Sequence, residues 1–172
     1  MDDSIALSEI DEKIVRAAAR THLKTGLVIA SHTGPDAPAF AQLDILREEG
    51  VTPGAFIWVH AQGGSMEGRL KAAQMGAWIS LDNVAADSAN IEHTISMIQS
   101  LKDKGFLNRI LLSHDAGWYS VGQANGGNYR GYTAIFTHLT PRLKASGFSD
   151  QEIRQLIEYN PQQAFRLGVA II

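Results

Sequence analysis

Four short apolar runs, each ending in a polar side chain and each followed by a helical segment, constrain this chain more than any other feature. Alternating β and α segments predict parallel strands, whose carboxyl ends meet at one edge of a sheet. We therefore predict an α/β fold in which the four polar side chains lie at one rim. The runs and their polar ends are 27–31 with His32, 56–59 with His60, 77–81 with Asp82, and 109–114 with Asp115.

A helix is predicted before the first run. Ile10 and Ile14 recur at helical spacing, Ser8 with Asp11 forms a capping-box pattern, and Gly26 provides a stop. The chain therefore reads as four parallel βα units preceded by a helix, and 172 residues hold about half of a (β/α)8 barrel. Further helices are predicted over residues 39–49, from the turn at 63–64 up to 75, and over 89–104, 132–145, 149–159 and 162–167.

Composition excludes several functional classes. A net charge of −3 gives no electrostatic reason to expect nucleic acid as a partner. No apolar run approaches the length of a membrane span, and the acidic start lacks the pattern of a signal peptide. We therefore expect a cytoplasmic protein that binds neither nucleic acid nor membrane. With no cysteine in the chain, any metal must bind nitrogen and oxygen ligands.

Imidazole and carboxylate groups at one rim are the ingredients of a metal site that activates water. His32 and His60 end neighbouring strands about 4.8 Å apart, so they can share a metal. Asp115 lies three strands from His32, roughly 14 Å away in a flat sheet, and only barrel curvature brings it closer. A site with one metal, both histidines and one carboxylate is a further possibility. The alternative to a metal site is that each of these two strands ends in a histidine whose ring nitrogens are satisfied by ordinary hydrogen bonds.

Other residues have competing interpretations. Asp82 is either a partner that orients a ligand histidine or a helix-capping carboxylate. The loop over residues 116–131 is long enough to suggest a functional segment, and Trp118, Tyr119 and Arg130 within it are candidate substrate-binding residues. A solvated loop arginine is the more common alternative for Arg130. His114 should point away from Asp115 and have a structural role.

Segments that cover nearly the whole chain resemble the phosphotriesterase family of the amidohydrolase superfamily, in the family's order and spacing. This resemblance implies a (β/α)8 barrel with a binuclear metal centre, and hydrolysis of phosphotriesters, lactones or related esters. The segments are residues 16–26, 31–33, 49–51, 59–60, 76–82, 110–115 and 160–161.

The resemblance also implies roles for individual residues. His32, His60, Asp82 and Asp115 would end barrel strands five to eight. His32 and His60 would bind the more exposed metal. Asp115 would bind the buried metal and accept a proton from the bridging hydroxide, which makes it the catalytic residue. The divalent metal is expected to be zinc, with manganese, cobalt or iron as alternatives.

The chain also departs from the family pattern. It contains no His-x-His motif, which the family has on strand one, and no lysine at the strand-four position that bridges both metals. We therefore expect residues 1–172 to form one partial domain, from helix four through strand eight and the C-terminal helices. One copy cannot supply a complete binuclear site.

Two functional hypotheses follow. In the first, the chain is the C-terminal half of a metal-dependent hydrolase, in which metal-activated hydroxide attacks a phosphoester or lactone. In the second, it is a truncated half-barrel that is catalytically incompetent and acts as a structural unit. Such a unit would associate with itself or with an N-terminal half-barrel, because a half-barrel exposes strand edges and apolar faces.

Overall fold

The computed structural model describes residues 7–167. Its centre is a parallel sheet with strand order β1-β2-β3-β4, built from Ile29–His32, Phe56–Val59, Trp78–Leu81 and Ile110–Leu112. Sequential strands pair as neighbours, with Ile57 beside Trp78 and Ile79 beside Ile110. The prediction of four parallel βα units is therefore confirmed.

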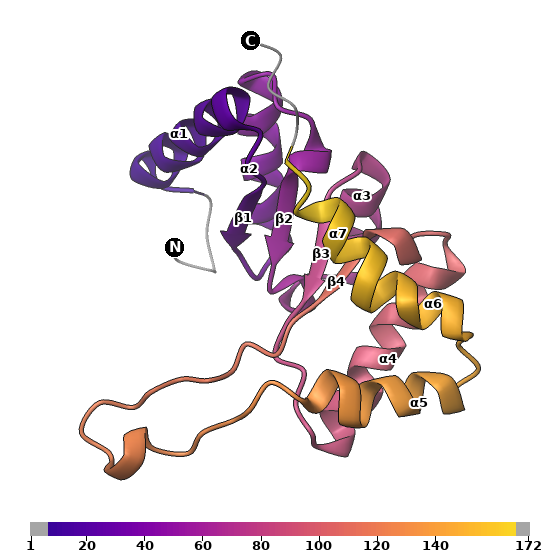
Figure 1. Cartoon of the computed structure of the whole chain (residues 1–172). Helices are drawn as coiled ribbons and strands as arrows, with labels where there is room; N and C mark the ends of the chain where they lie inside the picture. Colours follow the sequence, from indigo (N-terminus) through magenta and orange to yellow (C-terminus); the bar gives the residue numbers. More distant parts are fainter. Residues whose placement is uncertain (1–6, 168–172) are drawn as a thin grey trace.

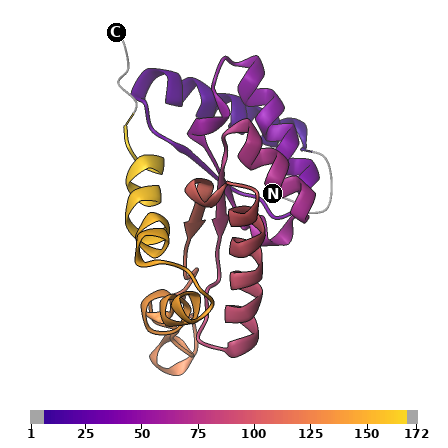
Figure 2. The ribbon, with the colours of Figure 1, turned by 90° about the vertical axis from the view of Figure 1, so that its right-hand side faces the viewer.

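Helices connect the strands and surround the sheet (Figure 1). In Figure 2, α2 and α3 lie on one side of the strands and the yellow C-terminal helices on the other. No helix among the described residues is both long and apolar enough for a bilayer crossing. The α-helices are α1 (Glu9–Thr25), α2 (Asp36–Glu48), α3 (Met66–Met75), α4 (Ser88–Asp103), α5 (Thr140–Ala145), α6 (Asp150–Arg154) and α7 (Asn160–Ala164).

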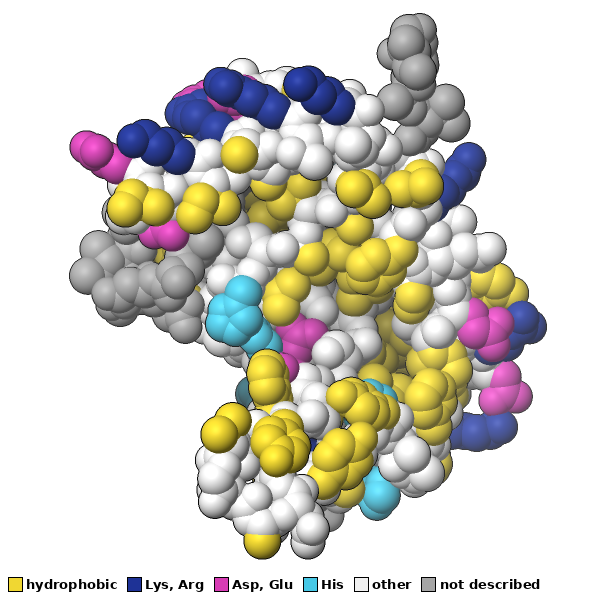
Figure 3. All heavy atoms as spheres, turned by 60° about the vertical axis from the view of Figure 1, so that its left-hand side comes forward, with side chains coloured by type: hydrophobic (Ala, Val, Ile, Leu, Met, Phe, Trp, Pro, Cys, Tyr) yellow, Lys and Arg dark blue, Asp and Glu magenta, His cyan; other side chains and the backbone are white. Residues whose placement is uncertain are grey.

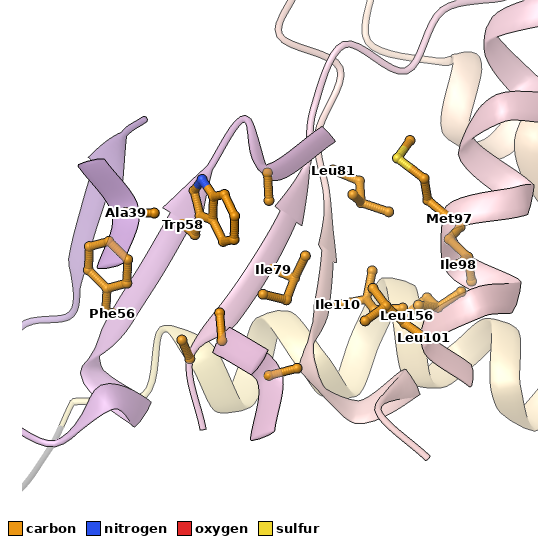
Figure 4. Packing of buried hydrophobic residues seen from close by; sticks show 14 of the residues in the cluster. Ala39, Phe56, Trp58, Ile79, Leu81, Met97, Ile98, Leu101, Ile110 and Leu156 are labelled. Carbon is orange, nitrogen blue, oxygen red and sulfur yellow. The ribbon is translucent and has the colours of Figure 1, made fainter. Parts of the chain in front are cut away.

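The main core lies between the sheet and the helices that cover it. Side chains from alternate strand positions, such as Trp58 and Ile79, point toward this layer, and Ile98 and Leu101 of α4 belong to the same buried cluster (Figure 4). A smaller cluster on the other face of the sheet contains Ile57, Trp78 and Leu111, against which α7 packs Ala164. This two-sided burial explains why the strands are nearly continuous apolar runs.

The first helix follows the sequence signals closely. Ser8 accepts a hydrogen bond from the Asp11 N–H, and the Asp11 carboxylate reaches back to the Ser8 N–H, which completes the predicted capping box. Gly26 closes α1 in the left-handed conformation at φ 71°. Arg16 and Arg20 of α1 pair with Glu49 at the end of α2, which fixes the two helices side by side.

Two helix boundaries differ from the prediction. The α2 helix begins at Asp36 rather than residue 39, because Pro38 lies in the first turn, where its missing N–H costs no hydrogen bond. The last helix does not restart at Pro161. Gln155 and Asn160 both keep helical angles, and a π-helical turn over Gln155–Tyr159 joins α6 to α7.

A second π-helical turn, Ile135–Leu139, precedes α5, so this helix starts slightly later than the predicted residue 132. Between β4 and this turn the chain forms a long arm that extends away from the sheet (Figure 1). Its only helical turn is Ala124–Gly126. The long loop predicted over residues 116–131 is therefore present.

Candidate active site at the carboxyl ends of the strands

The two predicted histidines lie next to each other at the rim. Strands β1 and β2 pair with His32 beside Val59, so His60 follows one position later on the neighbouring strand. The two imidazole rings meet edge to face, with centroids 4.3 Å apart. In Figure 3, histidine and acidic side chains adjoin in the middle of one face, next to exposed hydrophobic side chains.

Backbone conformations at this rim are unusual. His60, Asn83 and Asp115 follow β2, β3 and β4, and all three have positive φ, at 60°, 65° and 45°. Residues other than glycine rarely adopt this region, and such residues concentrate at functional sites. The strand ends therefore have a backbone geometry that the surrounding contacts must maintain.

Asp82 provides one of those contacts. Its carboxylate accepts a hydrogen bond from the His60 N–H at 2.6 Å and another from the Ser80 hydroxyl at 2.8 Å. The Asp82 side chain is only 3% exposed, and Oδ2 lies 3.5 Å from His60 Nδ1. The helix-capping alternative is wrong, because Asp87 caps α4 by accepting from the Asn90 N–H.

Gln62 also belongs to this group, although the sequence analysis did not identify it. Its Oε1 accepts a hydrogen bond from the Asp82 N–H at 3.0 Å, and its Nε2 lies 3.3 Å from His60 Nδ1. The sequence feature that could have identified Gln62 is its position two residues after a strand-end histidine, in the turn Ala61–Gly63. Gln62, His60 and Asp82 thus form one connected network.

Asp115 is held through its backbone. Its carbonyl accepts hydrogen bonds from Trp118 Nε1 at 3.1 Å and from Arg130 Nη2 at 2.5 Å, and its N–H donates to Ser113 Oγ. Within residues 7–167, no group of three histidine, aspartate or glutamate side chains is arranged to hold a metal ion. The structure therefore joins His32 with His60 but does not add Asp115 to them.

The three candidate substrate-binding residues differ in their surroundings. Trp118 and Tyr119 are 70% and 72% exposed on the arm. Arg130 is neither free nor simply solvated, because its guanidinium donates to Asn83 Oδ1 and to the carbonyls of His114 and Asp115. Arg130 thus joins the base of the arm to the ends of β3 and β4.

His114 has the structural role that the sequence predicted. It is buried, and its Nε2 accepts a hydrogen bond from the Ile135 N–H at 3.0 Å. Burial, and secondarily the positive charge of Arg130, lower the pKa of the His114 imidazole. A neutral His114 therefore connects the end of β4 to the helix that follows the arm.

The donor chemistry at the rim fits a divalent metal only in part. Two adjacent imidazoles are typical ligands of Zn²⁺, and the buried Asp82 next to His60 resembles the carboxylate that often orients a ligand histidine. A protein metal site normally has at least three protein ligands. Among the described residues only His32 and His60 lie together in this way, so any further ligands have to come from outside this pair.

Comparison with known proteins gives consistent results. A family model for the phosphotriesterase family matches residues 2–165. The phosphotriesterase homology protein of Escherichia coli is 33% identical over 162 residues, which are 93% of this chain and 55% of that relative. Its crystal structure, with phosphate in the active site, matches with a TM-score of 0.78 at 32% identity, covering 92% of this chain and 55% of that one.

Two further relatives are a lactonase and a phosphatase. The crystal structure of a Listeria monocytogenes lactonase matches 95% of this chain and 52% of its own, with a TM-score of 0.80 at 25% identity. The aryldialkylphosphatase of Saccharolobus solfataricus is 27% identical over 177 residues, 95% of this chain and 55% of the relative. The chain thus spans about half the length of the curated relatives it matches.

Proposed function

Because the chain belongs to the phosphotriesterase family, whose members are TIM-barrel proteins, we propose that it is the C-terminal half-barrel of a metal-dependent hydrolase. Residues 1–172 would form one partial domain that contributes strands five to eight of the barrel. The observation that carries this proposal is the contact between His32 and His60 at the carboxyl rim, 4.3 Å between ring centroids. Active sites of (β/α)8 enzymes lie at this rim.

In this proposal, His32 and His60 hold a divalent metal, with zinc as the expected ion. The chemistry that such a metal supplies is polarisation of a carbonyl or phosphoryl oxygen and acidification of bound water. Asp82 fixes the backbone of His60 through the 2.6 Å hydrogen bond from the His60 N–H and so orients the imidazole. Ligands that the described residues do not supply come from the other half of the barrel.

Asp115 has the role of a proton acceptor in this proposal. Its carboxylate follows β4, and the hydrogen bonds from Trp118 and Arg130 to its carbonyl maintain the left-handed backbone at φ 45°. A carboxylate whose backbone is fixed in this way can take the proton of an attacking water. Closure of the barrel would bring Asp115 nearer to the histidines than it is in the open sheet.

The expected substrates are small esters, lactones or phosphoesters. This expectation rests on the names of the relatives, which include a lactonase and an aryldialkylphosphatase. The exposed aromatic side chains Trp118 and Tyr119 on the arm beside Asp115 offer apolar surface for the leaving group or acyl chain of such a substrate. Arg130 takes part by positioning the arm.

Reconstitution of the barrel tests this proposal. The chain would be mixed with a second polypeptide that carries the part of the Escherichia coli relative it does not cover, in the presence of Zn²⁺. We expect hydrolysis of an aryl phosphotriester or an aromatic lactone by the mixture, and about 100-fold or greater loss with Asp115→Asn. His93→Ala, on the exposed side of α4, is the matched control. Hydrolysis that is unchanged by Asp115→Asn would refute the proposal.

A second candidate function is that of an associating half-barrel without activity of its own. Strand β1 has a single neighbour among the described strands, and Ile10 and Ile14 of the adjacent α1 are 69% and 59% exposed. Exposed apolar side chains that adjoin one another indicate an interaction surface more strongly than isolated ones do. Association of this chain with itself, or with an N-terminal half-barrel, would cover this edge.

A further inference from the structure

The Nδ1 atom of His60 faces two groups that make opposite demands on it. The side-chain amide of Gln62 lies 3.3 Å away through Nε2, and the carboxylate of Asp82 lies 3.5 Å away through Oδ2. An amide nitrogen can only donate a hydrogen bond, and a carboxylate can only accept one. A neutral imidazole has one protonated nitrogen, so Nδ1 can satisfy Gln62 or Asp82 but not both.

The orientation of the Gln62 amide follows from its other contact. The backbone N–H of Asp82 points at one end of this amide at 3.0 Å. Since an N–H can only donate, the end facing it has to be the oxygen, and the NH₂ group therefore faces His60. This assignment depends on a backbone donor and not on any choice of proton position.

Asp82 is the more distant of the two partners of Nδ1, and both of its oxygens have other donors. Its Oδ2 already accepts the His60 N–H at 2.6 Å, and its Oδ1 accepts the Ser80 hydroxyl at 2.8 Å. Both separations from Nδ1, 3.3 Å to the Gln62 amide and 3.5 Å to Asp82 Oδ2, lie just beyond the usual range of about 2.7–3.2 Å, and the Gln62 contact is the shorter. The amide of Gln62 is thus the nearer partner of Nδ1.

We propose that Gln62 is a positioning residue that keeps Nδ1 of His60 unprotonated in the metal-free chain and so places the ring proton on Nε2. The tautomer matters because a histidine that binds a metal through Nε2 carries its proton on Nδ1, usually toward a carboxylate. To reach that state, Nε2 loses its proton to water, Nδ1 takes one from water, and the Gln62 amide turns away. Gln62 thereby opposes Asp82 and sets a threshold for metal binding. This consequence for metal binding rests on the proposed function.

Histidine ring nitrogens can be observed directly. Long-range ¹H–¹⁵N spectra of the ¹⁵N-histidine-labelled chain without metal, at about pH 8.5 where free imidazole is neutral, report which nitrogen carries the proton. The His60→Gln variant identifies the His60 signals. We expect Nδ1 of His60 to be unprotonated in the wild type, and also in Gln151→Leu, a control glutamine on the exposed side of α6.

Two substitutions separate hydrogen bonding from shape. Gln62→Glu keeps the size of the side chain and an acceptor for the Asp82 N–H, but it replaces the NH₂ group with oxygen. Gln62→Met removes the amide without adding charge. Both should change Nδ1 of His60 to its protonated form as the major species, and backbone amide spectra verify that each variant is folded.

A protonated Nδ1 in the wild type would overturn the proposal, as would variants whose His60 spectrum matches that of the wild type. A purely structural role for Gln62 predicts the latter result. Neither metal nor substrate enters the measurement. Absence of hydrolytic activity would therefore count against the proposed function alone and leave the tautomer assignment standing.

Discussion

Asn160 is fully buried, and its side-chain amide joins the last helix to the sheet. Its Nδ2 donates to the carbonyls of Leu107 and Ile110 at 2.8 and 2.7 Å, and its Oδ1 accepts from Gln155. Buried polar groups have to be paired, and a buried carbonyl without its donor costs free energy. The Asn-Pro pair at this place is therefore part of the connection between α7 and β4.

Asn160→Ala should lower the free energy of unfolding by about 2 to 3 kcal/mol, because the buried carbonyl of Ile110 and the partly buried carbonyl of Leu107 lose their donor. Urea unfolding followed by circular dichroism measures the change. Asn108→Ala, at an exposed position near the same strand, is the control and should change the stability by less than about 0.5 kcal/mol. Equal effects of the two substitutions would contradict this account.

Single residues also show what the sequence could predict about the site. The adjacency of His32 and His60 followed from parallel strands of known spacing, and the structure places their rings in contact. The network of Gln62 with Asp82 could not be predicted, because it depends on side-chain rotamers in a turn. The contacts of Arg130 with two carbonyls depend in the same way on how the arm folds back.

At the scale of elements, the α6 helix is fixed to α4 by a charged contact. Glu152 occupies the third position of α6, accepts hydrogen bonds from the Ser149 N–H and hydroxyl, and pairs with Lys102 at 2.8 Å. The hydrogen bond from Lys102 and then that from Ser149 lower the pKa of Glu152 to about 2, from an ordinary value of 4.5. The ionised form of Glu152 is thus favoured in the folded state.

This lowered pKa predicts a pH dependence of stability. The folded state holds Glu152 ionised where the unfolded state would protonate it, so the contribution is fully present above about pH 4.5 and is lost as the pH falls toward about 2. Glu152→Gln should therefore flatten the fall in stability over this range. Chemical unfolding at several pH values measures it, with Glu12→Gln on the exposed side of α1 as control. If the stability of Glu152→Gln depended on pH as that of the wild type does, the contact between Glu152 and Lys102 could not be the source of the pH dependence.

Elements with strong local signals were predicted best. The α1 helix has a capping box at Ser8 and a left-handed glycine at its end, and both signals were visible in the sequence. The C-terminal helices were predicted less well, because the π-helical turn before Asn160 lets the helix continue through a proline. No local sequence pattern specifies such a turn, since it depends on packing against β4.

At the scale of the whole molecule, the sheet has the strand number and order of half a (β/α)8 barrel. The sequence predicted this architecture because apolar runs and helical segments alternate at regular intervals, and the similarity to solved relatives confirms it. How the barrel is completed could not be predicted, because the residues that would cover β1 are not among those described.

If the edge formed by α1 and β1 mediates association, Ile14→Glu should weaken it about tenfold or more, because a charge replaces an apolar side chain that the partner would bury. Sedimentation velocity of the chain at several concentrations measures this effect. Val121→Glu is the matched control, since Val121 is 91% exposed on the arm. A wild-type chain that stays monomeric at all concentrations would contradict self-association.

The central claim is that the histidine pair at the rim binds a divalent metal. Calorimetric titration of the chain with Zn²⁺ tests it most directly, since two adjacent imidazoles should bind the ion weakly with water in the positions of the ligands that the other half of the barrel would supply. We predict a binding isotherm in the wild type and in the control with His22→Ala and His93→Ala. We also predict that the isotherm is retained in Asp115→Asn, because Asp115 lies outside the pair, and that it is lost when His32→Ala and His60→Ala are combined. An isotherm that survives this double substitution, or its absence from the wild type, would contradict the account.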